Sequence, residues 1–393
     1  MKTMRILIYI PQLIYGGAEK VLVSFANELV MHGHKVQVLE LYERGLLKPQ
    51  FDAQVTFDAV CSKAYTEKYY ASLAQVKKDP RLLGKLLFSK IVGYRRFAEK
   101  LAAKRYADQS FDVAINYLET ESPAFLLENI HAKMYLQWIH IDVGKLQGKD
   151  ALDAFSPAWQ KTDGVVCVSR VAKESFMQRY PELSDKTHLL YNFYDEAEIK
   201  RKGREPFSFV GDSPVLLSVG RMTEQKQYLR FLQVLARLRD EGYSFSWHVL
   251  GEGGQRRAIE EKIASLGLAD RVFLHGLTDN PYKYMKNCDL FVLPSGWEGF
   301  PTVTVEAKAL GCAVLATDVA GIREQLVHGK TGWIVDNDAE AIYEGIKRLL
   351  EDTALCESLR CSEGMEDIIK NESKYRAFIK LSSIKGETVC SEE

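Results

Sequence analysis

Two carboxylates flank a proline-bearing turn that leads from an apolar run into a segment with helical periodicity. Glu298 precedes the turn and Glu306 follows it, and the apolar run 289–294 before them predicts a buried strand. Pro301 is expected at the first helical position, where its missing N–H costs nothing. The first amides of a helix point outward at the positive end of its dipole and favour an anion. The stretch therefore predicts a phosphate site.

The offset between the helix start and the second glutamate suits a nucleotide diphosphate. The outward amides are those of Thr302 and Val303, and Glu306 lies roughly 6 Å further along the axis. A phosphate at the helix end with a ribose beside it fits that offset. In a chain with 27% charged residues, an isolated pair of glutamates is more commonly solvated surface. Their position at the carboxyl end of a strand, where open α/β sheets bind ligands, favours the binding interpretation.

Cationic side chains follow another predicted strand, 214–219. Arg221 and Lys226 come after Gly220, where a fork of N–H donors and a point charge could grip a diphosphate. An Arg and a Lys in a loop are more commonly surface charge. The next loop, 251–254, contains Glu252 between glycines and would give a nucleotide close access to the backbone.

The Glu-Gly-Phe-Pro turn, the Glu298 to Glu306 spacing and the Gly-Arg and Lys pair together resemble the retaining glycosyltransferases of family 4. The resemblance implies the GT-B fold, in which two doubly wound Rossmann-like α/β domains face each other across a cleft. It also implies that Arg221 and Lys226 hold the donor phosphates and that Glu298 binds the sugar hydroxyls. Glu306 would bind ribose, and the turn 300–303, with Phe300, Pro301, Thr302 and Val303, would line the donor site.

The first half offers fewer chemical signals. Gly16 and Gly17 end the loop after the first strand and open a helix, but they form neither a dinucleotide fingerprint nor a P-loop. In the resembling family this loop faces the donor phosphates and the acceptor. His140 and Asp142 follow a predicted strand. By resemblance, His140 lies against the donor sugar and Asp142 meets the acceptor, although a lone His after a strand is usually structural.

Strands and helices alternate through the chain, as in doubly wound folds. We predict an N-terminal acceptor-binding domain over 1–195, completed by a C-terminal helix within 367–393, and a nucleotide-sugar-binding domain over 206–366. The charged stretch 194–212 has no clear periodicity and is predicted as a linker. The predicted strands are 4–10, 35–41, 54–60, 111–118, 133–138, 164–169, 186–191, 214–219, 245–250, 271–275, 289–293, 313–317 and 331–335. Predicted helices of the second domain are 225–241, 254–266, 281–287, 301–310 and 339–351.

The segment 77–105 is helical in pattern and strongly basic. One interpretation is an amphipathic helix packed on its domain with a solvated basic face. The other is peripheral contact with an anionic membrane, at about 1 kcal/mol per basic residue near the surface. A lipid-linked acceptor would make both interpretations compatible.

Composition limits the remaining function classes. The 393 residues suffice for two domains, and a net charge of -1 gives no general attraction to nucleic acid. Seven scattered cysteines indicate neither a disulfide framework nor a zinc site and fit a reducing cytoplasm. No window suits a membrane span, and the apolar N-terminus is better explained as a strand than as a signal peptide. Asp336-Asn-Asp338 is predicted to cap a helix, so we expect no metal and no cofactor.

The predicted function is transfer of a hexose with retention from a nucleotide sugar, with uridine as the expected base. The acceptor would be a glycan or a lipid-linked glycan in cell-envelope or capsule synthesis, in the cytoplasm or at the inner face of the membrane. The resemblance implies front-face attack, with the departing phosphate taking the acceptor's proton. A nucleotide-sugar epimerase and an inactive nucleotide-binding scaffold on the same fold are the alternatives.

Overall fold

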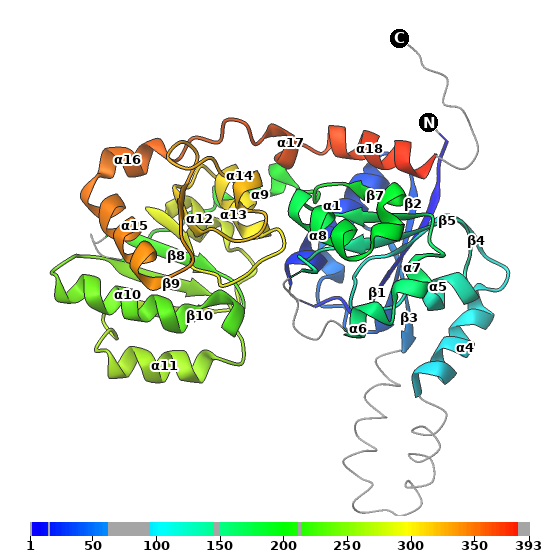
Figure 1. Cartoon of the computed structure of the whole chain (residues 1–393), viewed down its shortest axis with the longest axis horizontal. Helices are drawn as coiled ribbons and strands as arrows, with labels where there is room; N and C mark the ends of the chain where they lie inside the picture. The colour runs from blue at the N-terminus through cyan, green and yellow to red at the C-terminus, as the bar shows by residue number, and fades with distance from the viewer. Residues whose placement is uncertain (1, 15, 62–93, 145–149, 211–213, 384–393) are drawn as a thin grey trace, which may run out of the picture. The chain divides into compact units, whose positions relative to one another are not determined.

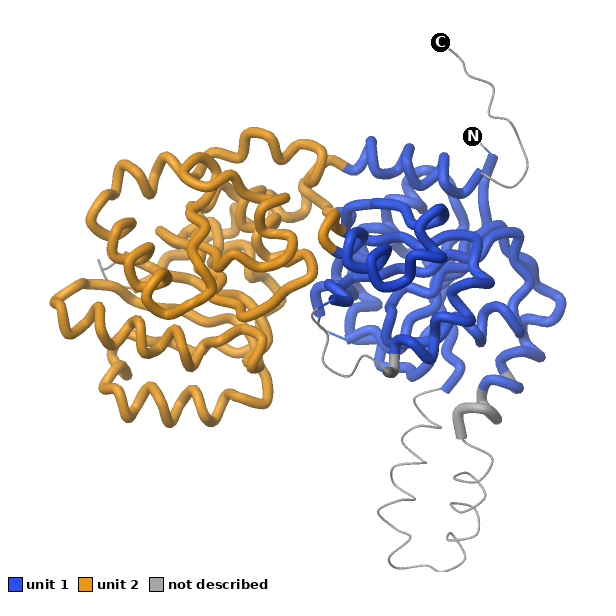
Figure 2. Tube along the Cα trace, in the orientation of Figure 1, with its two compact units in different colours: residues 1–168, 172–193, 371–393 blue, residues 169–171, 194–370 orange. Residues whose placement is uncertain are grey.

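A computed structural model describes residues 2–14, 16–61, 94–144, 150–210 and 214–383. The chain packs into two compact units, coloured separately in Figure 2. Unit 1 comprises residues 1–168, 172–193 and 371–393, and unit 2 comprises residues 169–171 and 194–370.

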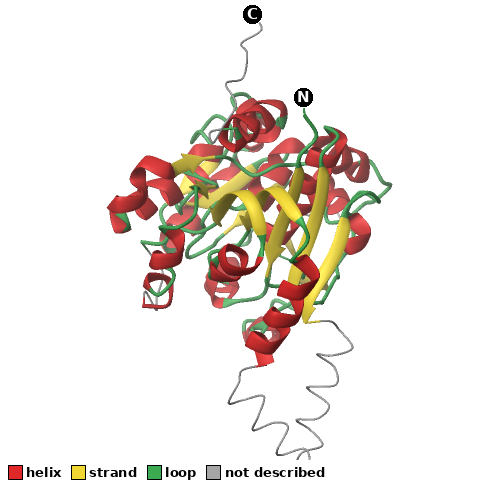
Figure 3. Cartoon of the chain, turned by 90° about the vertical axis from the view of Figure 1, so that its right-hand side faces the viewer, coloured by secondary structure: helices red, strands yellow, loops and turns green. Residues whose placement is uncertain are grey.

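Unit 1 is built on a seven-stranded sheet in the order β3-β2-β1-β4-β5-β6-β7, and all of its neighbouring strands are parallel. The order reverses between β1 and β4, which makes the sheet doubly wound. Figure 3 shows the twisted strands with helices beside them. The strands are β1 (Arg5–Ile10), β2 (Lys35–Tyr42), β3 (Thr56–Cys61), β4 (Ser110–Asn116), β5 (His131–Ile139), β6 (Gly164–Cys167) and β7 (Thr187–Leu189).

Helices complete unit 1 because its strands are apolar on both faces and need cover on both. The C-terminal helix α18 packs here, where its Tyr375 hydroxyl lies 2.8 Å from His34 Nε2 and its buried Lys374 donates to Asn192 O at 2.8 Å. The helices are α1 (Gly17–Met31), α4 (Tyr94–Tyr106), α5 (Ala124–Asn129), α6 (Asp150–Asp153), α7 (Ser156–Trp159), α8 (Arg170–Arg179) and α18 (Glu372–Ser382), with 3-10 turns at Lys48–Gln50 and Pro181–Lys186.

Unit 2 has a six-stranded parallel sheet in the order β10-β9-β8-β11-β12-β13. Its strands β8, β9 and β10 and its helices α10 and α11 are labelled in Figure 1. A large core joins the sheet to α10, α11 and α15 on one face, and α9, α12 and α13 pack together as a second group. The strands are β8 (Val215–Val219), β9 (Ser246–Leu250), β10 (Val272–Gly276), β11 (Leu290–Leu293), β12 (Val314–Thr317) and β13 (Trp333–Val335). The helices are α9 (Glu196–Gly203), α10 (Tyr228–Asp240), α11 (Arg256–Ser265), α12 (Tyr282–Asn287), α13 (Thr302–Ala309), α14 (Ile322–Gln325), α15 (Ala339–Glu351), α16 (Thr353–Ser358) and α17 (Glu366–Ile369).

Every predicted strand is present, so the α/β expectation is confirmed. The stretch 194–212 differs, because it contains the helix α9 instead of forming a plain linker. Asp195 caps this helix by accepting from the Glu198 amide at 2.8 Å, and ion pairs of the i,i+3 and i,i+4 type cover its outer side. Only Ile199 and Gly203 are buried, which is why no apolar periodicity is visible in the sequence.

Asp338 caps α15 as predicted, with its Oδ1 2.8 Å from the Ala341 amide. Among the residues that the structure describes, no group of three or more His, Cys, Asp or Glu side chains could hold a metal ion. In the same residues, no helix is both long and apolar enough to cross a bilayer.

The basic segment 77–105 falls mostly outside the described residues, which resume at α4. Arg105 at the end of α4 pairs with Asp58 at 3.2 Å and donates to Ala59 O at 2.7 Å. Arg105, at least, therefore makes its ion pair and its hydrogen bond within unit 1. The membrane interpretation stays a prediction.

We expect acid to destabilise unit 2 through a pair of histidines on neighbouring strands. His248 Nδ1 lies 2.8 Å from His275 Nε2, and burial, with the charge of His275, lowers the pKa of His248 to about 4. A depressed histidine pKa means that stability is complete above the unfolded value of about 6.5 and is lost as pH falls toward 4. The expected loss is about 2 kcal/mol at pH 5.

Urea unfolding at pH 7.5 and pH 5 measures this loss. The variant His248→Phe should show a smaller difference between the two pH values than the wild-type protein. An equal difference in both proteins would show that this histidine does not carry the effect.

Candidate functional site

The loops after β8 and β11 meet through a part-buried ion pair. Lys226 Nζ lies 2.6 Å from Glu298 Oε1, with the two side chains 13% and 8% exposed. Ser295 Oγ donates to the same carboxylate oxygen at 2.7 Å, and Gln225 Nε2 donates to the other oxygen at 3.2 Å. Since β8 and β11 are neighbours in the sheet, their carboxyl ends bring these two loops together. The sequence predicted both charged residues, and the structure joins them.

Arg221 belongs to the same loop as Lys226, but its side chain is exposed. Among the described residues, no ion pair or hydrogen bond links that side chain to the segment 295–306. The loop itself is fixed by its backbone: the Met222 amide donates to Glu252 O at 2.9 Å, and the Gln255 amide donates to Met222 O at 2.9 Å. Arg221 is therefore held on an ordered loop, with its guanidinium open to solvent.

Glycines allow the loops after β8 and β9 to touch. A Cβ at Gly251 would lie 2.0 Å from Gly220 O, and Gly251 has a φ of 143° that side-chain-bearing residues rarely adopt. A Cβ at Gly253 would lie 2.4 Å from Met222 O. Between these glycines, the Glu252 carboxylate is 41% exposed and pairs with Arg256, the first residue of α11. The backbone of this loop is thus close-packed, while the Glu252 side chain pairs with the first residue of the following helix.

The helix α13 begins at Thr302, with Pro301 as its N-cap, so Pro301 lies one residue before the predicted helical position. Two side chains fix the Pro301 carbonyl: Thr304 Oγ1 donates to it at 2.8 Å and Gln325 Nε2 at 3.1 Å. The amides at the start of α13, those of Thr302 and Val303, are among the four that have no acceptor within a helix. They remain the predicted anion site.

Two predicted residues near α13 are buried. Phe300 is 6% exposed, and Gly321 packs against it so closely that a Cβ there would lie 2.9 Å from Phe300 Cα. Glu306 is 2% exposed, with the Tyr282 hydroxyl 3.5 Å from its Oε1. The Glu306 carboxylate is thus held at a fixed place along α13, and its contact with ribose stays a prediction.

In unit 1, His140 follows β5 at the carboxyl edge of the sheet. Its amide donates to Glu119 Oε2 at 2.9 Å, and its ring lies 4.8 Å from the ring of Tyr117. Burial lowers the pKa of His140 to about 4, so the ring is neutral at physiological pH. Asp142 Oδ1 accepts from the Gly144 amide at 3.0 Å, which uses this carboxylate in a local turn.

The glycine pair opens α1, with Gly16 as the N-cap and Gly17 as the first helical residue. The Glu19 side chain folds back so far that a Cβ at Gly16 would lie 2.1 Å from Glu19 Oε2. The carboxylate stands three residues after the cap, as in a capping box, and its charge suits the helix start. A carboxylate therefore lies at the loop that the resemblance placed against the donor phosphates, and donor contact by Gly16 and Gly17 stays a prediction.

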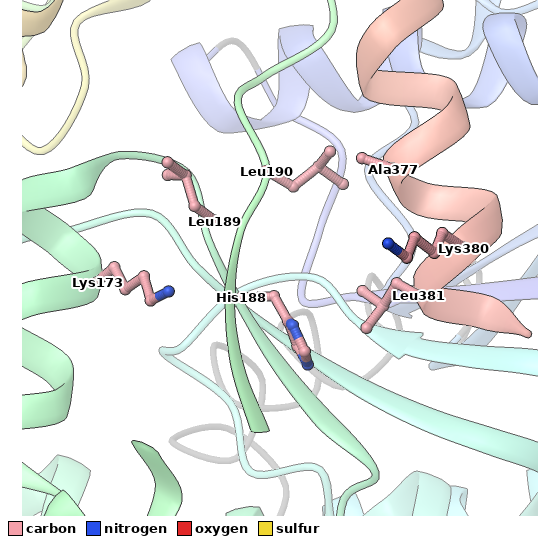
Figure 4. Close-up of a pocket in the computed structure, with 7 residues that line it drawn as sticks. All are labelled: Lys173, His188, Leu189, Leu190, Ala377, Lys380 and Leu381. Carbon is pink, nitrogen blue, oxygen red and sulfur yellow. The ribbon is translucent and has the colours of Figure 1, made fainter. Parts of the chain in front are cut away.

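A separate hollow of about 230 Å³ lies between α8, β7 and α18 in unit 1. Figure 4 shows the side chains of Lys173 and Lys380 pointing toward β7 from opposite helices, with His188 on the strand. None of the residues predicted from the sequence lines this hollow.

Three contacting residues were missed by sequence reasoning. Ser295 and Gln225 hold Glu298, and Glu119 holds the backbone of His140. Their positions after the carboxyl ends of predicted strands could have indicated that they contact the site. Ser, Gln and Glu are so common on surfaces that the signal is weak without coordinates.

Comparison with known proteins matches residues 199–380 to the family described as glycosyl transferases group 1. The N-acetylgalactosamine-N,N'-diacetylbacillosaminyl-diphospho-undecaprenol 4-alpha-N-acetylgalactosaminyltransferase of Campylobacter jejuni is 32% identical over 221 residues, which is 56% of this chain and 56% of that protein. The capsular polysaccharide biosynthesis glycosyltransferase CapM of Staphylococcus aureus is 32% identical over 184 residues, 44% of this chain and 48% of CapM. The chain thus spans about half the length of these curated relatives. Both of these relatives are named as glycosyltransferases.

The Anabaena protein Alr3699/HepE, crystallised with UDP-glucose, superposes with a TM-score of 0.73, covering 97% of this chain and 100% of that one at 18% identity. Such identity is evidence for the fold alone, and it agrees with the two doubly wound sheets. The chain therefore has the GT-B fold, and its residues 199–380 are similar in sequence to glycosyl transferases group 1.

Proposed function

We propose that the protein is a retaining glycosyltransferase of family 4 that moves a hexose from a nucleotide sugar, expected to be a UDP-hexose, to a lipid-linked or other glycan acceptor. The observation that carries the proposal is the part-buried Lys226 to Glu298 pair at the carboxyl ends of β8 and β11. It joins a cation to a carboxylate at the edge where doubly wound sheets bind ligands.

The charges suggest how the site works. Cleavage of the sugar-phosphate bond leaves new negative charge on the diphosphate and positive character on the sugar. Lys226, Arg221 and the first amides of α13 would stabilise the diphosphate. Glu298, held by Ser295 and Gln225, would hydrogen-bond the sugar hydroxyls, and the departing phosphate would take the proton of the acceptor.

The relatives favour a cell-envelope acceptor. The Campylobacter jejuni relative is named for a substrate linked to diphospho-undecaprenol, and CapM is named for capsular polysaccharide biosynthesis. We propose the same class of acceptor for this protein, with the reaction at the cytoplasmic face of the membrane. Lys226 and Arg221 provide positive charge of the kind that a metal would otherwise supply, so we propose that transfer needs no metal.

The test is incubation of the purified protein with UDP- and GDP-hexoses, with and without a diphospho-undecaprenol glycan acceptor, in the presence of EDTA. We expect acceptor-dependent release of UDP and a product with the anomeric configuration of the donor, read by NMR. Conversion of the donor to an epimer without acceptor would instead show the epimerase. Binding of UDP without turnover on any donor and acceptor would indicate the inactive scaffold.

A further inference from the structure

Glu119 is a buried acid that the proposed mechanism does not yet use. It lies in the loop after β4 and is 4% exposed. Burial raises the pKa of its carboxyl group, and the negative charge of Glu19 on α1 adds to the effect. A buried carboxyl group is costly unless its hydrogen bonds repay the lost hydration. Its contacts therefore indicate what it does.

The carboxyl group of Glu119 fixes the end of the neighbouring strand. Its Oε2 accepts the amide of His140 at 2.9 Å, and that amide is the first after β5 ends at Ile139. The strands β4 and β5 are adjacent and parallel, so Glu119 bridges their two carboxyl ends. This bond sets where the chain turns away from the sheet.

The His140 ring is held in one protonation state. Burial lowers the pKa of the ring and the Tyr117 backbone, as a hydrogen-bond acceptor, raises it by less, while Nε2 is buried and has no hydrogen-bond partner among the described residues. We therefore assign the proton to Nδ1, which leaves Nε2 with a free lone pair. A neutral imidazole in this state can only accept a hydrogen bond at Nε2. The group that meets it must be a donor such as a sugar hydroxyl, and an ionised phosphate oxygen would not fit.

We propose that Glu119 is a positioning residue: it anchors the backbone after β5 so that His140 presents Nε2 to a hydroxyl of the sugar substrate. This proposal deepens the proposed function and rests on it. Glu119 itself needs no contact with substrate. Any side chain that offers an acceptor oxygen at the same place should anchor the His140 backbone equally well.

Three variants test the assignment. Glu119→Ala removes the acceptor, Glu119→Gln keeps an acceptor oxygen without the acid, and Glu128→Ala is the matched control, because Glu128 is an exposed glutamate on α5 of the same unit. The first readout needs no substrate: the ¹⁵N spectrum of the His140 ring over a pH series, assigned with His140→Gln. The second is the kinetics of sugar transfer, measured beside the Kd for UDP.

In Glu119→Ala we expect the pKa of His140 to rise from about 4 toward 6.5, because the ring is no longer held in its buried site. We also expect kcat/KM to fall about ten- to a hundredfold, the usual range for losing a buried hydrogen bond to an acidic group. The Kd for UDP should stay within twofold. Glu119→Gln should restore both the ring spectrum and most of the rate.

Two results would overturn the proposal. One is an unchanged His140 titration in folded Glu119→Ala. The other is a Glu119→Gln variant as impaired as Glu119→Ala, which would mean that the acid meets substrate directly. If the wild-type protein transfers no sugar, the proposed function fails while the ring spectrum still decides whether Glu119 positions His140.

Discussion

Replacing Lys226 by alanine is expected to lower the rate of sugar transfer about a hundred- to a thousandfold, the usual effect of removing one group that stabilises transition-state charge. The side chain is only 13% exposed and lies 2.6 Å from Glu298, so its charge acts in a site with little water. Ser295 and Gln225 still donate to Glu298 in the variant, which should allow it to fold. Single-turnover kinetics with saturating donor measure the effect.

The control is Lys133→Ala, which removes a lysine that is 72% exposed and paired with Asp112 at the surface of unit 1. Its transfer rate should equal that of the wild-type protein, since exposed ion pairs contribute little. Thermal melting of both variants checks the fold. If folded Lys226→Ala kept its rate within about threefold, Lys226 would not stabilise the leaving group.

Replacing Gly251 by alanine is expected to destabilise unit 2 by about 3 kcal/mol or more and to abolish nucleotide binding. The new Cβ would lie 2.0 Å from Gly220 O, and the φ of 143° is unfavourable for alanine. To relieve this clash the loops after β8 and β9 must separate, and their separation displaces Arg221 and Lys226. Urea unfolding and calorimetry with UDP measure the two effects.

Gly254, in the same loop, provides the control variant. A Cβ at Gly254 would meet nothing within 4 Å, so Gly254→Ala should change stability by no more than about 0.5 kcal/mol and should still bind UDP. Equal behaviour of the two variants would show that close packing at Gly251 does not hold the site.

The sheet architecture could be predicted from sequence because the buried parallel strands are short apolar runs between charged helices. The meeting of Lys226 with Glu298 was predictable for a related reason, since parallel strands direct their following loops to one edge. The helix α9 was not predictable in this way. Its stability comes from a cap and surface ion pairs around one buried isoleucine, Ile199, and such a helix has no apolar stripe.

The details of the site depend on side-chain packing that no motif encodes. Three contacts illustrate this: the Glu19 carboxylate lies over Gly16, Glu306 is buried against Tyr282, and the His140 amide donates to Glu119. The first depends on the rotamer of one side chain at a turn, and the other two connect residues that are distant in the sequence. Sequence spacing fixes which edge of a sheet a residue occupies. Coordinates are needed to show whether its side chain faces a ligand or a neighbour.

The most direct measurement is a crystal structure with UDP and an unreactive donor analogue bound. We expect the diphosphate within hydrogen-bond distance of Lys226 Nζ and of the amides of Thr302 and Val303, with Glu298 on the sugar and Glu306 on the ribose. A diphosphate bound anywhere else, with the Lys226 to Glu298 pair intact and remote from it, would show that this pair does not form the donor site.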